Sequence, residues 1–127
     1  MATVSPPSVL AVTTPDLPGY RIVRPLGIVA GETVMGTGWA SDLVAGFKDS
    51  TGDRVREWEA EIERARYSAI VEMTQRAHAW GANAVVGVAL DYDVMGQGGS
   101  IILVTATGTA VVVTPTGGHS GEQDALR

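Results

Sequence analysis

The segment from residue 81 to residue 93 constrains the fold more than any other part of this chain, because a helix end and a buried strand meet there. Gly81 directly follows a long helical pattern. Glycine takes the left-handed conformation that closes a helix without a Cβ clash. The apolar run at residues 84–90 is typical of a buried strand. This junction predicts an architecture, but it contains no pattern that is specific for a chemical reaction.

Residues 53–80 have the strongest helical pattern in the chain. Apolar side chains recur there at intervals of three and four, so they share one face of a helix. These residues are Val55, Trp58, Ile62, Ala65, Ala69, Met73, Ala77 and Trp80. Tyr67, Ile70 and Val71 widen the apolar stripe beyond what one contact with a sheet requires.

Two strands are predicted at residues 84–94 and 100–113, joined by a glycine-rich, hairpin-like link. Alternation along each strand assigns its side chains to two faces. The side chains predicted to face the helix are Ala84, Val86, Val88, Leu90, Tyr92, Val94, Ile102, Val104, Ala106, Ala110 and Val112. The side chains predicted on the opposite face are Val85, Ala89, Asp91, Asp93, Ile101, Leu103, Thr105, Thr107 and Thr109. That face is apolar at one end, so it needs a partner.

An edge strand with a bend or bulge, or two short strands, is predicted at residues 20–35, because Pro25, Gly27 and Gly31 interrupt an apolar run. A short helix is expected at residues 40–47. The order of these elements predicts an α+β fold. We expect a small, mainly antiparallel sheet of three to four strands packed on one long helix, plus the short helix.

One domain with a single core suits a chain of 127 residues. We expect this domain to span residues 19–113. Residues 1–18 hold four of the six prolines and are expected to be a flexible lead-in. Residues 114–127 are expected to be a disordered tail.

Composition excludes several classes of function. The net charge is −5 and Lys48 is the only lysine, which argues against a nucleic-acid surface, because phosphate is neutralised by clustered basic side chains. The chain has no cysteine, so disulfides, thiolate nucleophiles and thiolate metal ligands are absent. No run reaches the roughly 18 apolar residues of a membrane helix. Residues 1–14 lack a signal-peptide pattern. We therefore expect a cytoplasmic protein that binds neither nucleic acid nor membrane.

Several short blocks occur in order along the chain: Thr13-Thr14, residues 27–32, residues 81–87, Asp91-Tyr92, Gly96 and residues 108–111. With these blocks, residues 13–113 resemble the YbjQ-like family, which is described as "putative heavy-metal-binding" and is otherwise uncharacterised. The resemblance implies a dodecin-like small α+β subunit and assembly as a homopentamer. The chain departs from the family pattern at residues 37–39 and 50–52 and in both tails.

Metal ligands are the first candidates for chemistry, because the family description names them. Heavy metals prefer cysteine or several histidines, but the histidines here are His78 and His119 alone. Asp91 and Asp93 alternate along one strand and point to one side, and with Glu32 they form our candidate site for a divalent metal ion. Symmetry would multiply these carboxylates into a ring. The other interpretation is an acidic pair that is solvated or lines an interface.

Other motifs favour structural roles. The link at residues 96–99 lacks the lysine of a phosphate loop and precedes a strand, which indicates a hairpin turn. No nucleophile motif surrounds Ser41, Ser68 or Ser100. Trp58 and Trp80 lie on the apolar stripe of the helix, which favours packing over ligand stacking.

Two hypotheses for function remain. The first is a non-catalytic, oligomeric binding or scaffold protein for metal ions or a small ligand. The alternative is an enzyme with an inter-subunit carboxylate site, in which Glu32, Asp91 and Asp93 act as acids or bases. Stabilisation by metal without turnover favours the first hypothesis. An activity that is lost in Asp91→Asn while assembly stays intact favours the second.

Overall fold

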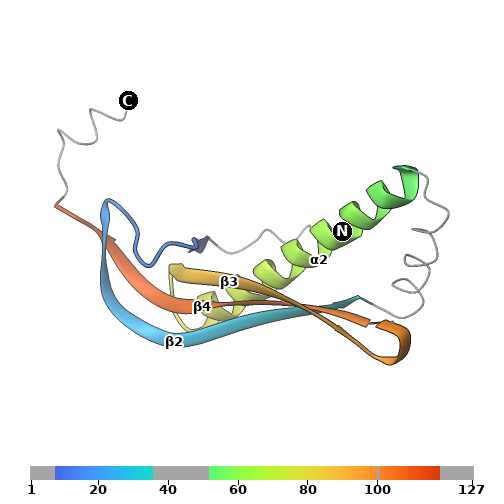
Figure 1. The fold of residues 1–127 in the computed structure, drawn as a ribbon. Helices are drawn as coiled ribbons and strands as arrows, with labels where there is room; N and C mark the ends of the chain where they lie inside the picture. Colours follow the sequence, from blue (N-terminus) through green and yellow to red (C-terminus); the bar gives the residue numbers. More distant parts are fainter. Residues whose placement is uncertain (1–7, 36–51, 100, 118–127) are drawn as a thin grey trace, which may run out of the picture.

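The structure, a computed structural model, describes residues 8–35, 52–99 and 101–117. One long helix lies across a twisted sheet (Figure 1). The elements are β1 (Leu10–Ala11), β2 (Tyr20–Met35), α2 (Gly52–Ala79), β3 (Ala84–Met95), a 3-10 turn (Gln97–Gly99) and β4 (Ile101–Pro115). The predicted α+β class is confirmed, and the predicted short helix at residues 40–47 lies outside the described residues.

The four strands form one sheet in the order β1-β3-β4-β2. Strand β4 is central and pairs antiparallel with both β3 and β2. Strand β1 adds a short parallel pairing to β3, which makes the sheet mixed. The predicted bend in the edge strand is confirmed, because the register of β2 against β4 shifts between Ile22 and Arg24 and again between Pro25 and Gly27.

Helix α2 packs mainly against β2 and, to a lesser extent, against β4. Its small side chains Ala65, Ala69 and Ala77 are buried together with Met73 against the sheet. The approach is closest at Gly31, where a Cβ atom would overlap the backbone oxygen of Ala69 and the backbone nitrogen of Met73. Glycine at this position therefore lets the helix backbone lie directly on β2.

The C-terminal end of α2 confirms the prediction for Gly81. Its φ of 92° is left-handed. The backbone nitrogen of Gly81 donates to His78 O (2.9 Å), and that of Ala82 donates to Ala77 O (3.0 Å). These two bonds form a Schellman motif, in which otherwise unpaired carbonyls of the last turn are satisfied. Ala77 and Ala82 are both buried in the core, which anchors the turn.

A β-bulge in β3 shows that part of the predicted face assignment was wrong. Val86 pairs with Thr109, but the next pair is Ala89 with Thr107, so β3 carries one extra residue. Gly87 lies in the bulge with a φ of 62°, a conformation that suits glycine. The extra residue reverses the faces, so Val85 joins the helix-side core, whereas Ala84 and Val86 join a second cluster on the opposite face.

The second cluster is covered by the segment that precedes β2. Leu17 is buried there with Val111 and Val113. Backbone bonds extend the pairing of β1, because Val12 N donates to Val85 O (2.9 Å) and Gly87 N donates to Thr14 O (2.8 Å). Residues 10–17 thus pack on the sheet as part of the folded domain, although they fall within the 1–18 segment that we expected to be a flexible lead-in.

Two further expectations concern the chain end and membranes. Strand β4 continues to Pro115, two residues into the 114–127 segment that we expected to be disordered. Thr116 N donates to Gly19 O (3.0 Å), which holds this end beside the start of β2. In the described ranges, no helix combines the length and apolar character that crossing a membrane requires.

Candidate functional site

The three predicted ligands lie on the face of the sheet opposite α2. Glu32 is on β2, and Asp91 and Asp93 are on β3, with β4 between the two strands. Glu32 and Asp91 both pair with Thr105, so these three residues form one row across the sheet. Asp93 lies in the next row, whose members are Leu103 and Val34. All three carboxylate residues are exposed.

This arrangement aligns the carboxylates but does not bring them together. The backbones of Glu32 and Asp91 are two strand spacings apart, which is about 10 Å. A calcium or magnesium ion needs oxygen ligands at about 2.0–2.6 Å. Within the described parts of the chain, no three Asp, Glu, His or Cys residues are close enough to hold a metal ion. The described residues of a single chain therefore do not assemble the three predicted ligands around one point.

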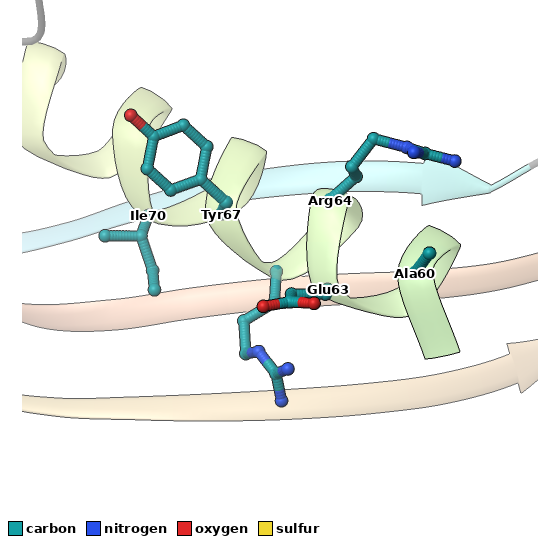
Figure 2. A pocket seen from close by; sticks show the side chains of 6 residues that line it. Ala60, Glu63, Arg64, Tyr67 and Ile70 are labelled. Atoms are coloured by element: carbon teal, nitrogen blue, oxygen red, sulfur yellow. The ribbon is translucent and has the colours of Figure 1, made fainter. Parts of the chain in front are cut away.

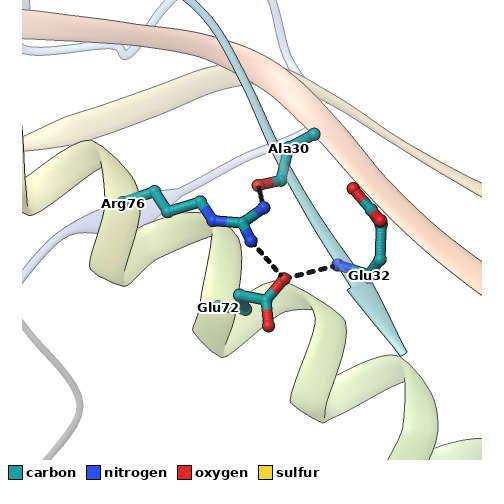
Figure 3. Close-up of polar contacts among 4 residues, drawn as sticks. All are labelled: Ala30, Glu32, Glu72 and Arg76. Atoms are coloured by element: carbon teal, nitrogen blue, oxygen red, sulfur yellow. Dashed lines mark hydrogen bonds and ion pairs between the residues drawn. The ribbon is translucent and has the colours of Figure 1, made fainter. Parts of the chain in front are cut away.

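Glu32 is held in place by the helix (Figure 3). Its backbone nitrogen donates to Glu72 Oε1 (3.0 Å), and that oxygen also pairs with Arg76 Nη2 (3.0 Å). Arg76 Nη1 donates to Ala30 O (2.8 Å). The Glu32 carboxylate points away from this network, and it has no hydrogen-bond or ion-pair partner in the described residues. Glu72 is thus engaged in structure, while the Glu32 carboxylate remains available.

The rest of this face divides into a polar and an apolar part. Thr105, Thr107 and Thr109 form a row of hydroxyl side chains along β4. Toward the β3–β4 turn the face becomes apolar, with Ile101, Leu103 and Val34, and Val34 is 63% exposed. Ile101 and Leu103 lie on this face as predicted, whereas Val85, which was predicted to lie beside them, is in the helix-side core. The apolar end leaves a hydrophobic surface next to the Asp93 row.

A second surface lies beside the N-terminal half of α2, and sequence reasoning did not identify it as a site. An open pocket of about 500 Å³ is lined by Ala60, Glu63, Arg64, Arg66, Tyr67 and Ile70 (Figure 2). Arg66 Nη1 reaches across to donate to the hydroxyl of Tyr92 on β3 (3.3 Å). Tyr67 is 61% exposed. The signal in the sequence was the widened apolar stripe at Tyr67 and Ile70.

The remaining sequence candidates do not form a catalytic site in the described residues. His78 is exposed in the last turn of α2, and Ser68 is exposed on the same helix. Ser41, Ser100 and His119 lie outside the described residues. Residues 97–99 form a 3-10 turn that leads into β4, which agrees with the predicted hairpin turn. Trp80 is half exposed at the end of α2, near Gly27.

Known proteins resemble this chain over most of its length. Residues 9–114 match the model of the YbjQ family, which is described as "Putative heavy-metal-binding". A UPF0145 protein of Bifidobacterium longum is 48% identical over 108 residues, which cover 85% of this chain and 98% of that relative. A UPF0145 protein of Acetivibrio thermocellus is 45% identical over 104 residues, which cover 82% and 98%. The matched region includes β1 and the segment that follows it.

A solved structure shares the fold. It is the crystal structure of a protein of unknown function in the DUF74 family from Pediococcus pentosaceus, with a TM-score of 0.57. The alignment covers 84% of this chain and 98% of that chain, at 12% sequence identity. At this identity the likeness concerns the fold alone.

Proposed function

The chain belongs to the YbjQ family, and we propose that it is a non-catalytic, oligomeric binding protein that holds a divalent metal ion at carboxylates contributed by more than one copy. The observation that carries this proposal is the row formed by Glu32, Thr105 and Asp91 on an open sheet face. Two carboxylates there have no partner within the described residues, and those residues do not complete a coordination sphere within one copy.

The oligomer is supported by exposed apolar side chains in two separate regions. One group lies where α2 faces the β3–β4 hairpin and contains Tyr67, Tyr92 and Val94. The others are Tyr20 and Val23, at the start of β2, and Trp80, directly after α2. Two different surfaces are what a head-to-tail contact requires, and such contacts close into rings.

Burial of these surfaces supplies the driving force. Apolar burial contributes roughly 25 cal/mol per Å², and stable interfaces bury about 800 Å² on each partner. An interface of that size offsets the entropy lost on association. The proposed ring has five copies, a number that comes from the family resemblance alone. We also propose that the protein is located in the cytoplasm.

The chemistry of the donors selects the ion. Carboxylate and hydroxyl oxygens suit hard cations such as Mg²⁺ and Ca²⁺, or borderline Zn²⁺, whereas soft ions prefer sulfur. The chain has no cysteine, so a thiolate site cannot form from its own residues. Repetition of Asp91, Asp93 and Glu32 around a ring would supply the oxygens that one copy lacks.

Light scattering and calorimetry on the full chain test the proposal. At micromolar concentration we expect a multiple of the 13.2 kDa chain mass, and a pentamer if the resemblance holds. Titration with Mg²⁺, Ca²⁺, Zn²⁺ and Cd²⁺ should show binding of a hard or borderline ion, weakened at least tenfold in Asp91→Asn and in Glu32→Gln. Glu57→Gln, an exposed carboxylate on α2, is the matched control and should bind like the wild type.

Two results would contradict this proposal. A stable monomer would rule out the proposed oligomer. Tight Cd²⁺ binding that is unaffected by either substitution would rule out the proposed carboxylate site. A closed ring of another size would change only the number of copies.

A further inference from the structure

We infer that the end of the sheet beyond α2 carries a ligand site for a phosphate ester with a planar ring, such as a nucleoside monophosphate. The site consists of Arg21, Arg24 and Trp80, and we call these three residues the basic row. All three belong to one copy of the chain, and the arginines lie on the face of the sheet opposite the carboxylates of the proposed metal site. The basic row therefore binds its ligand independently of that metal.

Two exposed arginines stand side by side on β2. Arg21 pairs with Thr114 and Arg24 pairs with Val112, and residues that pair directly lie on the same face. Thr114 and Val112 alternate with the β4 residues of the second cluster, so both arginines are on the helix side of the sheet. Because their partners are two residues apart on β4, the arginines are about 7 Å apart along the strand. Tyr20 alternates with Arg21, so a subunit contact through Tyr20 would lie on the other side of β2.

Helix α2 ends before it reaches these arginines, and Trp80 stands where it ends. Strands β2 and β4 continue past the C-terminal end of the helix (Figure 1). Trp80 is half exposed, and its Cζ3 atom lies 4.0 Å from the position that a Cβ atom would take on Gly27. Gly27 pairs with Ala110, the next helix-side residue of β4 after Val112. The indole ring thus follows Arg21 and Arg24 along the same side of β2.

The two guanidinium groups lack a counter-charge in the described part of the chain. Neither Arg21 nor Arg24 has a hydrogen bond or an ion pair with a described residue. The acidic Asp16 is near in sequence, but it belongs to the segment that covers the opposite face of the sheet. Acidic residues are absent from the three stretches that form this end of the molecule, which are residues 17–31, 73–90 and 106–117. A chain of net charge −5 thus presents an end that is complementary to an anion.

The chemistry of the basic row selects the ligand. Guanidinium groups are charged at every physiological pH and bind phosphate through paired N–H donors. An exposed indole ring stacks on planar rings with little regard to their substituents.

The C-terminal end of a helix carries partial negative charge, which repels phosphate. Trp80 lies at that end, whereas Arg21 and Arg24 lie beyond it. The ligand therefore places its phosphate on the arginines and its ring on the indole. Inorganic phosphate or a free nucleoside would use only a part of the basic row.

Calorimetric titration of the full chain tests this site with AMP, adenosine and inorganic phosphate, in buffer without divalent metal ions. We expect AMP to bind more tightly than either of the other two. Arg24→Gln should weaken AMP binding at least about tenfold, because it removes a paired donor, and should leave adenosine binding unchanged. Trp80→Leu should weaken the binding of both. Arg64→Gln, an exposed arginine of α2 that pairs with Glu61, is the control and should bind AMP like the wild type.

Amide chemical shifts of the wild type give a second measure that needs no variant. AMP should shift the amides of Arg21, Arg24 and Gly27 and the indole N–H of Trp80, and should leave residues 59–67 unchanged. Shifts centred elsewhere would overturn the inference, as would a failure of AMP to bind at millimolar concentration.

Three results of the titrations would also overturn it. The first is equal affinity for AMP and adenosine, and the second is an equal loss of AMP binding in Arg24→Gln and Arg64→Gln. The third is binding to vesicles of anionic lipid that is tighter than AMP binding and is lost in Arg24→Gln, because the basic row would then be a membrane contact. The metal titrations of Asp91→Asn and Glu32→Gln are read separately, so the proposed function stands or falls on its own.

Discussion

Asn83 and Val113 are joined by a pair of hydrogen bonds between a side-chain amide and a strand backbone. Asn83 Nδ2 donates to Val113 O (2.9 Å), and Val113 N donates to Asn83 Oδ1 (2.8 Å). Asn83 N also donates to Val111 O (3.1 Å). The side chain thus acts as one more residue of β3, and it starts the strand directly after the helix-ending turn at Gly81.

Replacing Asn83 with alanine should destabilise the protein, because both backbone groups of Val113 lose their partners. An unsatisfied, partly buried backbone group costs about 1–3 kcal/mol, so we expect Asn83→Ala to lower the free energy of unfolding by about that amount. Urea denaturation at one fixed protein concentration measures the change, since assembly makes stability depend on concentration. Gln97→Ala in the exposed turn is the control and should change the midpoint little. Equal stability of the two variants would show that water replaces the Asn83 amide without loss.

Gly31→Ala should be strongly destabilising, because the added methyl group meets backbone atoms of Ala69 and Met73, which cannot rotate away. Overpacking of this kind typically costs about 1–3 kcal/mol. We expect a clear drop in the thermal midpoint of Gly31→Ala. Ala89→Ser adds one heavy atom at an exposed position on β3 and should leave the midpoint nearly unchanged. A midpoint for Gly31→Ala that equals that of Ala89→Ser would mean that α2 does not lie as close to β2 as described.

Substitutions at Gly81 should measure the energetic cost of the left-handed backbone conformation without a contribution from steric overlap. No atom lies within 4 Å of a Cβ placed there, so any cost arises from the left-handed φ of 92°. Alanine in this conformation costs roughly 1–2 kcal/mol, whereas asparagine is tolerated better. Gly81→Ala should therefore lose more stability than Gly81→Asn in guanidinium unfolding. The reverse order would argue against the Schellman turn.

Arg76 should limit strand pairing at β2 more than it adds to stability. Its side chain and that of Glu72 are about half exposed, so their ion pair contributes about 0–1 kcal/mol at most. We expect Arg76→Ala to lower the midpoint slightly and to increase heat-induced aggregation, because the carbonyl of Ala30 becomes available to other chains. Turbidity during heating measures this. Arg64→Ala, which breaks the exposed ion pair with Glu61, is the control. Equal turbidity of the two variants would contradict the proposed role of Arg76 in limiting strand pairing.

The sequence allowed the long helix, the turn at Gly81 and the antiparallel β3–β4 pair to be predicted, because each has a local pattern. The faces of β3 could not be predicted along its whole length. Residues 84–88 are all apolar except for Gly87, so no alternation of polar and apolar side chains shows where the bulge lies. Strand β1 was missed since a strand of two residues depends on its partner rather than on its own sequence. Asp91 and Asp93 were placed on the correct face, whereas the sequence assigned no face to Glu32. The row through Thr105 depends on strand register, which no local pattern specifies.

The bulge at Gly87 has a consequence for how the molecule opens. Because β3 gives Ala84 and Val86 to one cluster and Val85 and Val88 to the other, the N-terminal segment and the helix are held by alternate residues of the same short stretch. Detachment of either layer would expose β3 to solvent, and the other layer also packs against β3. The two layers should therefore melt as one cooperative unit, with no intermediate in which the helix stays docked while residues 10–17 are released.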